Sequence, residues 1–225
     1  MEDLEKLKNE ILSLVGEYSK KENGNKPFIG GVTHIPVTGK VVDEDDIKNL
    51  VESSLDGWFT SGHFTDKFEK KINSFLGTRH TLFVNSGSSA NLIAISALKE
   101  LYNIQDGDEV ITCAVGFPTT INPIIQNNLV PVLIDADIKT FNINPDLIEA
   151  SISNKTKGIV LAHTLGNPFN VQKIKDICKK YNLFLMEDNC DALGSKYNNE
   201  FTGTFGDVAT LSFYPAHHIT TGEGG

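Results

Sequence analysis

Two histidines near the end of the chain are its residues best suited to moving a proton. His217 and His218 stand between the pair Ser212-Phe213 and the run Gly222-Glu-Gly-Gly225. An imidazole takes up and releases a proton near neutral pH, so a histidine here can serve as a general base. The segment therefore predicts proton-transfer chemistry in a turn that follows a strand.

A second polar cluster follows the apolar run at residues 81–84. It reads Asn85-Ser-Gly-Ser-Ser-Ala-Asn91 and opens a predicted helix. Gly87 permits a tight turn, and the backbone amides of Ser88 and Ser89 would point outward at the positive end of that helix. Such an end binds phosphate groups, although the same residues also suit a plain serine N-cap.

Four further candidates follow apolar runs that we expect to be strands, namely Phe117, His163, Glu187 and Asp188. Ligands bind at the carboxyl ends of the strands in an open parallel sheet. There an aromatic side chain can stack on a flat ring, a histidine can bond a ring hydroxyl, and a carboxylate can keep a ring nitrogen protonated. Each residue also has a structural explanation: a core phenylalanine, a histidine satisfied at the sheet edge, and a solvated acidic pair.

Apolar runs alternate with helical patterns from residue 81 onward. We expect strands at residues 81–84, 109–112, 130–134, 158–162, 183–186 and 208–213. We expect helices at residues 88–101, 119–126, 145–151 and 171–181, and three earlier ones at about 4–18, 43–55 and 65–75. The alternation predicts an α/β domain with a mainly parallel, seven-stranded-type sheet covered by helices on both faces.

Two domains are expected, an N-terminal helical segment over residues 1–55 and a large ligand-binding domain over residues 56–225. The chain stops directly after a glycine-rich turn, without a closing helix. We therefore expect the large domain to be truncated at its C-terminal end, with a C-terminal domain missing.

Composition narrows the function classes. The 20 lysines and arginines against 29 acids give a net charge of −9, which disfavours nucleic acid and anionic membranes as partners. The sequence has neither a long apolar run nor a signal-peptide pattern. The three cysteines are scattered, which suits a reducing cytoplasm and matches no metal-ligand or cluster spacing; they are Cys113, Cys178 and Cys190.

Taken together and in this order, the clusters resemble the fold-type I pyridoxal-phosphate (PLP) enzymes and, among them, the DegT/StrS family of nucleotide-sugar aminotransferases and dehydratases. The resemblance runs from Ile35-Pro-Val-Thr-Gly39 to the end of the chain. By matched position it implies that Gly87, Ser88, Ser89 and Ser212 bind the cofactor phosphate.

The resemblance also assigns residues to the cofactor ring. Phe117 would stack on it, and Asp188 would pair with its nitrogen. His163 would lie near the ring oxygen. Asp191 stands where many members carry a glutamine that contacts the ring hydroxyl.

His217 occupies the family's lysine position, five residues after Ser212. That lysine holds the cofactor as a Schiff base, which a histidine cannot form. Lys196 is the sole lysine between Lys180 and the end of the sequence, and it lies in a predicted surface turn. We therefore expect the cofactor to stay as pyridoxamine phosphate (PMP), with His217 as the catalytic base that takes a proton from its C4′ carbon while a 4-keto sugar loses its C3 hydroxyl.

Residues 212–225 resemble the 3-dehydrases that act on CDP-4-keto-6-deoxy-D-glucose in the 3,6-dideoxyhexose pathways of lipopolysaccharide O-antigen. That resemblance implies a homodimer, a [2Fe-2S] cluster bound beyond residue 225 in a full-length parent, and a flavin reductase as electron donor. A GDP-4-keto-6-deoxymannose 3-dehydratase, a nucleotide-sugar aminotransferase and an inactive fragment or binding module remain alternatives.

Overall fold

The computed structural model describes residues 2–23, 27–36 and 41–225. These residues form two compact units, one extending to Lys71 and the other comprising Ile72–Gly225. The boundary falls inside helix α3 (His63–Leu76), whereas the sequence-based division at residue 55 remains a prediction. Most of the segment Ile35-Pro-Val-Thr-Gly39 lies outside the described residues.

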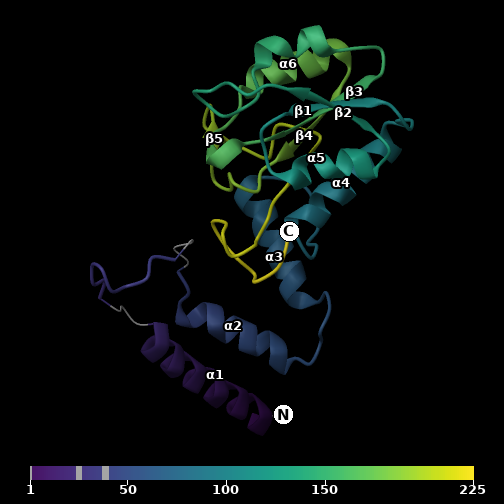
Figure 1. Cartoon of the computed structure of the whole chain (residues 1–225). Helices are drawn as coiled ribbons and strands as arrows, with labels where there is room; N and C mark the ends of the chain where they lie inside the picture. Colours follow the sequence, from purple (N-terminus) through teal and green to yellow (C-terminus); the bar gives the residue numbers. More distant parts are fainter. Residues whose placement is uncertain (1, 24–26, 37–40) are drawn as a thin grey trace. The chain divides into compact units, whose positions relative to one another are not determined.

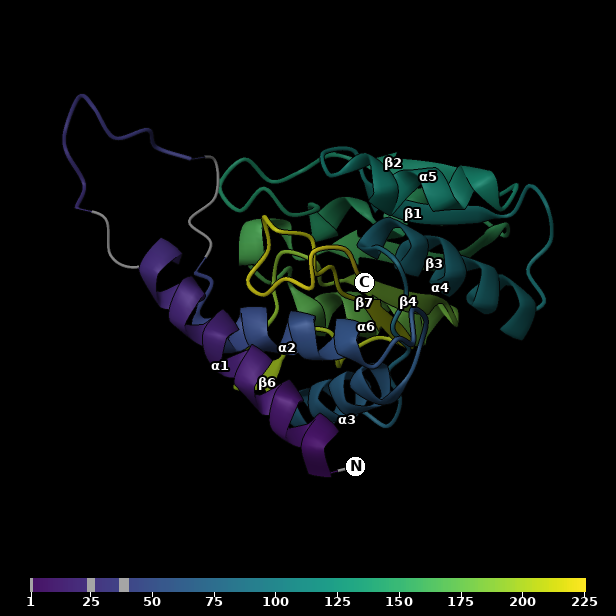
Figure 2. The same cartoon turned by 90° about the horizontal axis from the view of Figure 1, so that it is seen from below.

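The first unit contains two antiparallel helices, α1 (Glu2–Asn23) and α2 (Glu44–Leu55), which lie side by side (Figures 1 and 2). Helix α2 begins with a capping box in which Asp43 and Asp46 satisfy each other's backbone amides. Two ion pairs of 2.8 Å join the helices near their opposite ends, Lys8 with Glu52 and Lys20 with Glu44. Both expected helices are confirmed.

The second unit alternates strands and helices. Its helices and 3₁₀ turns after α3 are α4 (Gly87–Leu101), α5 (Pro118–Gln126), η1 (Pro145–Leu147), η2 (Glu149–Ser151), η3 (Thr164–Gly166) and α6 (Val171–Tyr181). Its strands are β1 (Glu109–Cys113), β2 (Val130–Ile134), β3 (Thr156–Ala162), β4 (Phe184–Asp188), β5 (Lys196–Tyr197), β6 (Glu200–Phe201) and β7 (Val208–Thr210).

Five of these strands form one parallel sheet in the order β2-β1-β3-β4-β7. Helix α6 covers one face, while α4 and α5 cover the other (Figure 1). Side chains alternate between these faces along each strand. In β4, Leu185 packs into the core under α6, whereas Phe184 and Met186 pack into the core under α4.

The expected strand at residues 81–84 is not part of the sheet, which has five strands in the described residues rather than seven. Val84 instead exchanges two backbone hydrogen bonds with Gly225, at 2.8 and 2.9 Å. Such an exchange is the pattern of an antiparallel pair. A strand needs a partner along its length, and among the backbone hydrogen bonds between described residues Gly225 pairs with Val84 alone.

Three smaller expectations also differ from the structure. The helix expected at residues 145–151 is a pair of 3₁₀ turns that meet at Ile148, each only three residues long. The last strand ends at Thr210 rather than Phe213. The short hairpin of β5 and β6 was not predicted; its turn residues, Asn198 and Asn199, both have positive φ, which asparagine tolerates.

Candidate active site

Asp188 ends strand β4 in a buried polar network at the carboxyl edge of the sheet. Its Oδ2 accepts hydrogen bonds from Asn91 Nδ2 at 3.0 Å and from Thr120 Oγ1 at 2.7 Å. Thr210 Oγ1, at the end of β7, donates to Asn91 Oδ1 at 2.6 Å. The network thus ties the carboxylate to the second turn of α4 and the first turn of α5.

Gly87, the first residue of α4, touches the loop after β7. A Cβ atom at this position would lie 2.6 Å from Ser212 Cβ and 3.2 Å from Cys190 Sγ. Only a glycine permits so close an approach without displacement of the neighbouring chain. The structure therefore brings Gly87 and Ser212 together, as the predicted phosphate site requires.

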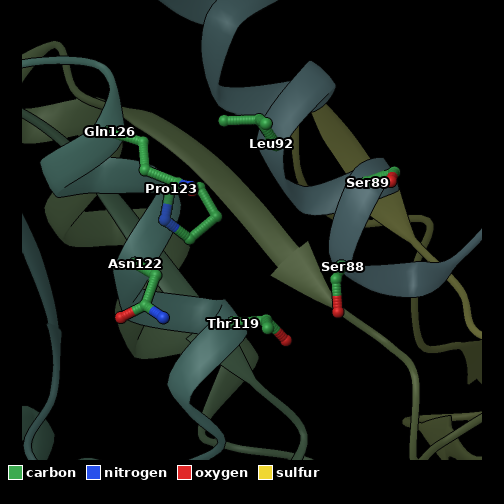
Figure 3. A pocket seen from close by; sticks show the side chains of 7 residues that line it. All are labelled: Ser88, Ser89, Leu92, Thr119, Asn122, Pro123 and Gln126. Carbon is green, nitrogen blue, oxygen red and sulfur yellow. The ribbon is translucent and has the colours of Figure 1, made fainter.

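Ser88 and Ser89 lie in the first turn of α4. Ser86, the N-cap, accepts a hydrogen bond from the Ser89 amide at 3.1 Å, so the capping explanation applies to one of the helix amides. Both serines also line a cavity of about 190 Å³ between α4 and α5 (Figure 3). The remaining lining residues are Leu92, Thr119, Asn122, Pro123 and Gln126.

Phe117 is the N-cap of α5, and its side chain is 68% exposed. It is not a core residue, which removes the structural explanation weighed for it. The Thr120 amide donates to the Phe117 carbonyl at 3.0 Å, and the Thr120 hydroxyl donates to Asp188. Phe117 is thus linked to Asp188 through one residue. An exposed ring in that place is free to stack on a flat ligand.

His217 pairs with Asp191, the third residue after Asp188. Their atoms Nδ1 and Oδ1 are 3.4 Å apart, and the His217 side chain is partly buried. His218 is exposed. The two histidines are thus distinguished, and the one with a carboxylate neighbour is the one predicted to be catalytic.

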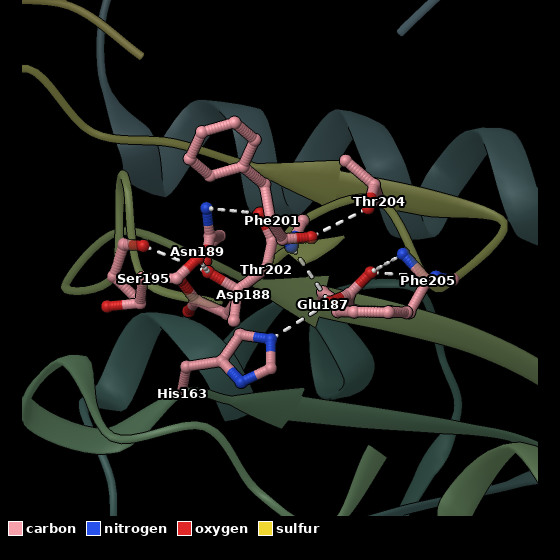
Figure 4. A network of polar contacts seen from close by, with 12 residues as sticks. His163, Glu187, Asp188, Asn189, Ser195, Phe201, Thr202, Thr204 and Phe205 are labelled. Atoms are coloured by element: carbon pink, nitrogen blue, oxygen red, sulfur yellow. Dashed lines mark hydrogen bonds and ion pairs between the residues drawn. The ribbon is translucent and has the colours of Figure 1, made fainter. Parts of the chain in front are cut away.

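His163 does not join this group. It is fully buried on the α6 side of the sheet, where its Nε2 lies 2.8 Å from Glu187 Oε2 (Figure 4). Its ring stacks on Phe169, with 4.2 Å between the ring centroids. The contact of His163 with a ring oxygen therefore stays a prediction, on a residue that lies on the other face of the sheet from the Asp188 carboxylate. Because consecutive strand residues face opposite sides, Glu187 and His163 lie on one side of the sheet and Asp188 on the other.

Glu187 is saturated with hydrogen bonds. Its Oε1 accepts from the amides of Phe205 and Gly206, both at 2.7 Å, and its Oε2 accepts from the Gly203 amide at 2.9 Å besides His163. Burial alone would raise the pKa of this carboxyl, but the hydrogen bonds from His163 and the backbone outweigh burial and lower it. Glu187 is thus a clamp on the loop between β6 and β7, not the solvated acid weighed from the sequence.

The residues on the α4 side suit a flat ring with a phosphate group. Asp188 is a buried carboxylate whose Oδ1 accepts a hydrogen bond from the Cys190 amide at 3.3 Å, which leaves acceptor capacity for a ring N–H. Gly87 and Ser212 form a tight cradle at the start of a helix, where an anion is stabilised. Phe117 supplies an exposed aromatic face. These features fit the PLP or PMP expected from the resemblance.

Within the described ranges, residues 2–23, 27–36 and 41–225, no cluster of three or more His, Cys, Asp or Glu side chains could hold a metal ion. Over the same ranges, no helix is both long and apolar enough to pass through a bilayer.

Residues 40–225 match the DegT/DnrJ/EryC1/StrS aminotransferase family. The chain belongs to this family. Its sheet and helices are accordingly those of a fold-type I PLP aminotransferase, as predicted.

Several relatives in this family are named as dehydratases. The chain is 52% identical over 223 residues to the lipopolysaccharide biosynthesis protein RfbH of Salmonella typhimurium, covering 97% of this chain and 51% of the relative. It is 50% identical over 222 residues to a dTDP-4-dehydro-2,6-dideoxy-D-glucose 3-dehydratase of Saccharopolyspora spinosa, covering 97% and 48%. The chain thus spans about half the length of the curated relatives it matches.

A solved structure shows the same architecture. The Escherichia coli GDP-4-keto-6-deoxy-D-mannose 3-dehydratase, with hydrated PLP bound, superposes with a TM-score of 0.81 at 34% identity. The match covers 85% of this chain and 50% of that chain.

The sequence reasoning missed Asn91, Thr120 and Thr210. Asn91 follows Gly87 by one helical turn, which places an amide on the buried side of α4. An asparagine inside an otherwise apolar helix face was the signal that could have identified it, because a buried amide needs partners.

Proposed function

We propose that this chain holds PMP and contributes the proton-transfer residues for 3-dehydration of a nucleotide-linked 4-keto-6-deoxyhexose. The observation that carries the proposal is a partly buried histidine at position 217, paired with Asp191, where a lysine would anchor the cofactor. The resemblance to relatives named as nucleotide-sugar 3-dehydratases supports it.

Each residue of the α4 side then has a task. Gly87, Ser88, Ser89 and Ser212 bind the cofactor phosphate at the helix end. Phe117 stacks on the ring, and Asp188 accepts the hydrogen bond of the protonated ring nitrogen. When bound, PMP supplies an amine that joins the keto carbon of the sugar and a ring that takes up electrons.

His217 moves the proton. With its ring proton on Nδ1, the nitrogen that lies 3.4 Å from Asp191 Oδ1, His217 keeps a lone pair on Nε2 that can accept a proton. We assign to this atom the proton that leaves the C4′ carbon as the C3 hydroxyl departs. Asp191, placed with the cofactor-binding residues on sequence grounds, thereby acts as the partner that orients the base.

We infer CDP-4-keto-6-deoxy-D-glucose as the substrate from the resemblance of residues 212–225. The name of the Salmonella relative supports a role in lipopolysaccharide biosynthesis. dTDP- and GDP-linked sugars are the competing substrates, as the names of other relatives indicate. For the whole protein we propose a homodimer, a [2Fe-2S] cluster and a flavin-dependent reductase partner. Turnover assays with the three nucleotide sugars, scored for sugar product by mass spectrometry, separate these substrates.

Borohydride reduction tests the central proposal. We expect the chain incubated with PLP and reduced with borohydride to carry no pyridoxyl adduct, because the position that would anchor the cofactor is a histidine, His217. The His217→Lys variant should gain one adduct at position 217, and His218→Lys, its matched control, should not. A stoichiometric adduct on Lys196 or another native lysine would contradict the proposal, and release of an amino sugar would favour an aminotransferase.

A further inference from the structure

Asp188 is held by a set of side chains that have no task in the mechanism above. Asn91 and Thr120 donate to the same oxygen, Oδ2, from two different helices. Asn91, Thr120 and Asp188 are each at most 5% exposed. Two donors fill the lone pairs of Oδ2, so that the remaining acceptor capacity of the carboxylate is on Oδ1.

The orientation of the Asn91 amide is fixed in turn. Its Nδ2 donates both to Asp188 and to the Thr119 carbonyl at 3.0 Å, while its Oδ1 accepts from Thr210 Oγ1. A flipped amide would turn its oxygen toward the Asp188 carboxylate and the Thr119 carbonyl, which only accept hydrogen bonds, and would lose both contacts. Thr210 Oγ1 donates to the other end of this amide and holds it in place, one contact away from Asp188.

We propose that Asn91, Thr120 and Thr210 are positioning residues that aim Asp188 Oδ1 at the cofactor's ring nitrogen. The inference rests on the proposed function, since it presupposes a ring nitrogen at Asp188. A carboxylate free to rotate about its χ2 angle would divide its population between orientations. Fixing Oδ2 from two helices leaves one orientation, which is the preorganisation that an electrostatic partner needs.

A purely structural role is the competing explanation, since a buried charge needs hydrogen-bond donors whatever its function. Thr120 separates the two explanations because matched substitutions are available. Thr120→Ser keeps the hydroxyl, whereas Thr120→Val keeps the shape and removes the donor. Asn91→Leu and Thr210→Val remove the other two polar groups at similar volume.

The experiment uses the full chain with PMP carrying ¹⁵N at the ring nitrogen. The ¹⁵N chemical shift reports whether the bound nitrogen is protonated, an absorbance titration gives the dissociation constant, and thermal unfolding reports stability. We expect Thr120→Ser to keep the wild-type shift. Thr120→Val and Asn91→Leu should move the signal toward that of the neutral ring and weaken PMP binding about tenfold or more, since hydrogen bonds to charged groups are at stake.

Two outcomes would overturn this inference. Variants that melt earlier but keep the wild-type ¹⁵N shift show a structural role alone, as does a Thr120→Ser variant that behaves like Thr120→Val. If Asn91→Leu does not fold, Thr210→Val, one contact further from the carboxylate, gives the same readout. Failure of the unsubstituted chain to bind PMP, or an Asp188→Asn variant with unchanged shift, contradicts instead the proposed function.

Discussion

Neighbouring carboxylates on β4 occupy two different environments. The Glu187 carboxylate faces α6 and accepts four hydrogen bonds, from one histidine and three backbone amides. The Asp188 carboxylate faces α4 and retains acceptor capacity on one oxygen. A carboxylate whose acceptor sites are all filled by the protein suits a structural role, as at Glu187. One with an unfilled acceptor site, as at Asp188, suits a contact with a ligand. The difference lies in the donors around each residue, which the dipeptide Glu187-Asp188 does not reveal.

Stability should depend on pH through Glu187. Its pKa is lowered in the folded chain, so it stabilises the fold above the pKa of the unfolded chain, roughly 4.3, and this contribution is lost as the pH falls through the lower folded value. We expect Glu187→Gln to lower the free energy of unfolding by about 3 kcal/mol at neutral pH, because amide hydrogens would face the backbone donors. Urea unfolding at several pH values measures both effects.

The exposed Glu200→Gln variant is the control for loss of one negative charge. It should unfold like the parent chain. A Glu187→Gln variant with unchanged stability at neutral pH and an unchanged acid slope would show that the clamp contributes nothing.

Proton transfer should depend on His217 and not on His218. In deuterated water, the C4′ protons of bound PMP exchange through the base. We expect His217→Gln to slow that exchange by about a hundred- to ten-thousand-fold, the usual contribution of a positioned base, while PMP affinity changes little. NMR of the bound cofactor measures the exchange, and His218→Gln is the matched control. Equal slowing of the C4′ proton exchange by both substitutions would contradict the assignment of His217 as the base.

At the scale of elements, the start of α4 and the loop after β7 meet at Gly87. We expect Gly87→Ala to cost about 1–3 kcal/mol, because a new Cβ would lie 2.6 Å from Ser212 Cβ, and to weaken binding of the cofactor phosphate. Gly116→Ala is the control, since a Cβ there meets nothing within 4 Å. Thermal unfolding and PMP titration of both variants check the prediction. A Gly87→Ala chain as stable as Gly116→Ala would show that the loop yields freely.

Elements with strong patterns were predictable, and those that depend on distant partners were not. Residues 171–181 carry a regular apolar stripe and form α6, with Asn170 as the cap. Residues 81–84 look equally like a strand, but a strand requires a neighbour along its whole length, which local sequence does not specify. The same limit applies to His163, whose position after a strand was predicted but whose face of the sheet was not.

At the scale of the whole molecule, the three cysteines report on the second unit, since all lie in it. Burial raises the pKa of each thiol, to about 12 for Cys178. We expect slow reaction with Ellman's reagent at pH 8 in the folded chain, with Cys178 having roughly a thousandfold less thiolate than a free cysteine. In guanidinium all three should react quickly and equally. Rapid reaction of Cys178 in the native chain would show that this unit opens readily.

The opposite orientation of Glu187 and Asp188 restricts how this segment can change in evolution. Inserting or deleting one residue within β4 would reverse the direction of every later side chain in the strand, exchanging the clamp for the ligand contact. An even-numbered change keeps the orientation and alters only the length. Homologous genes should therefore tolerate gaps in the turns that flank β4 far more readily than single-codon gaps within residues 184–188.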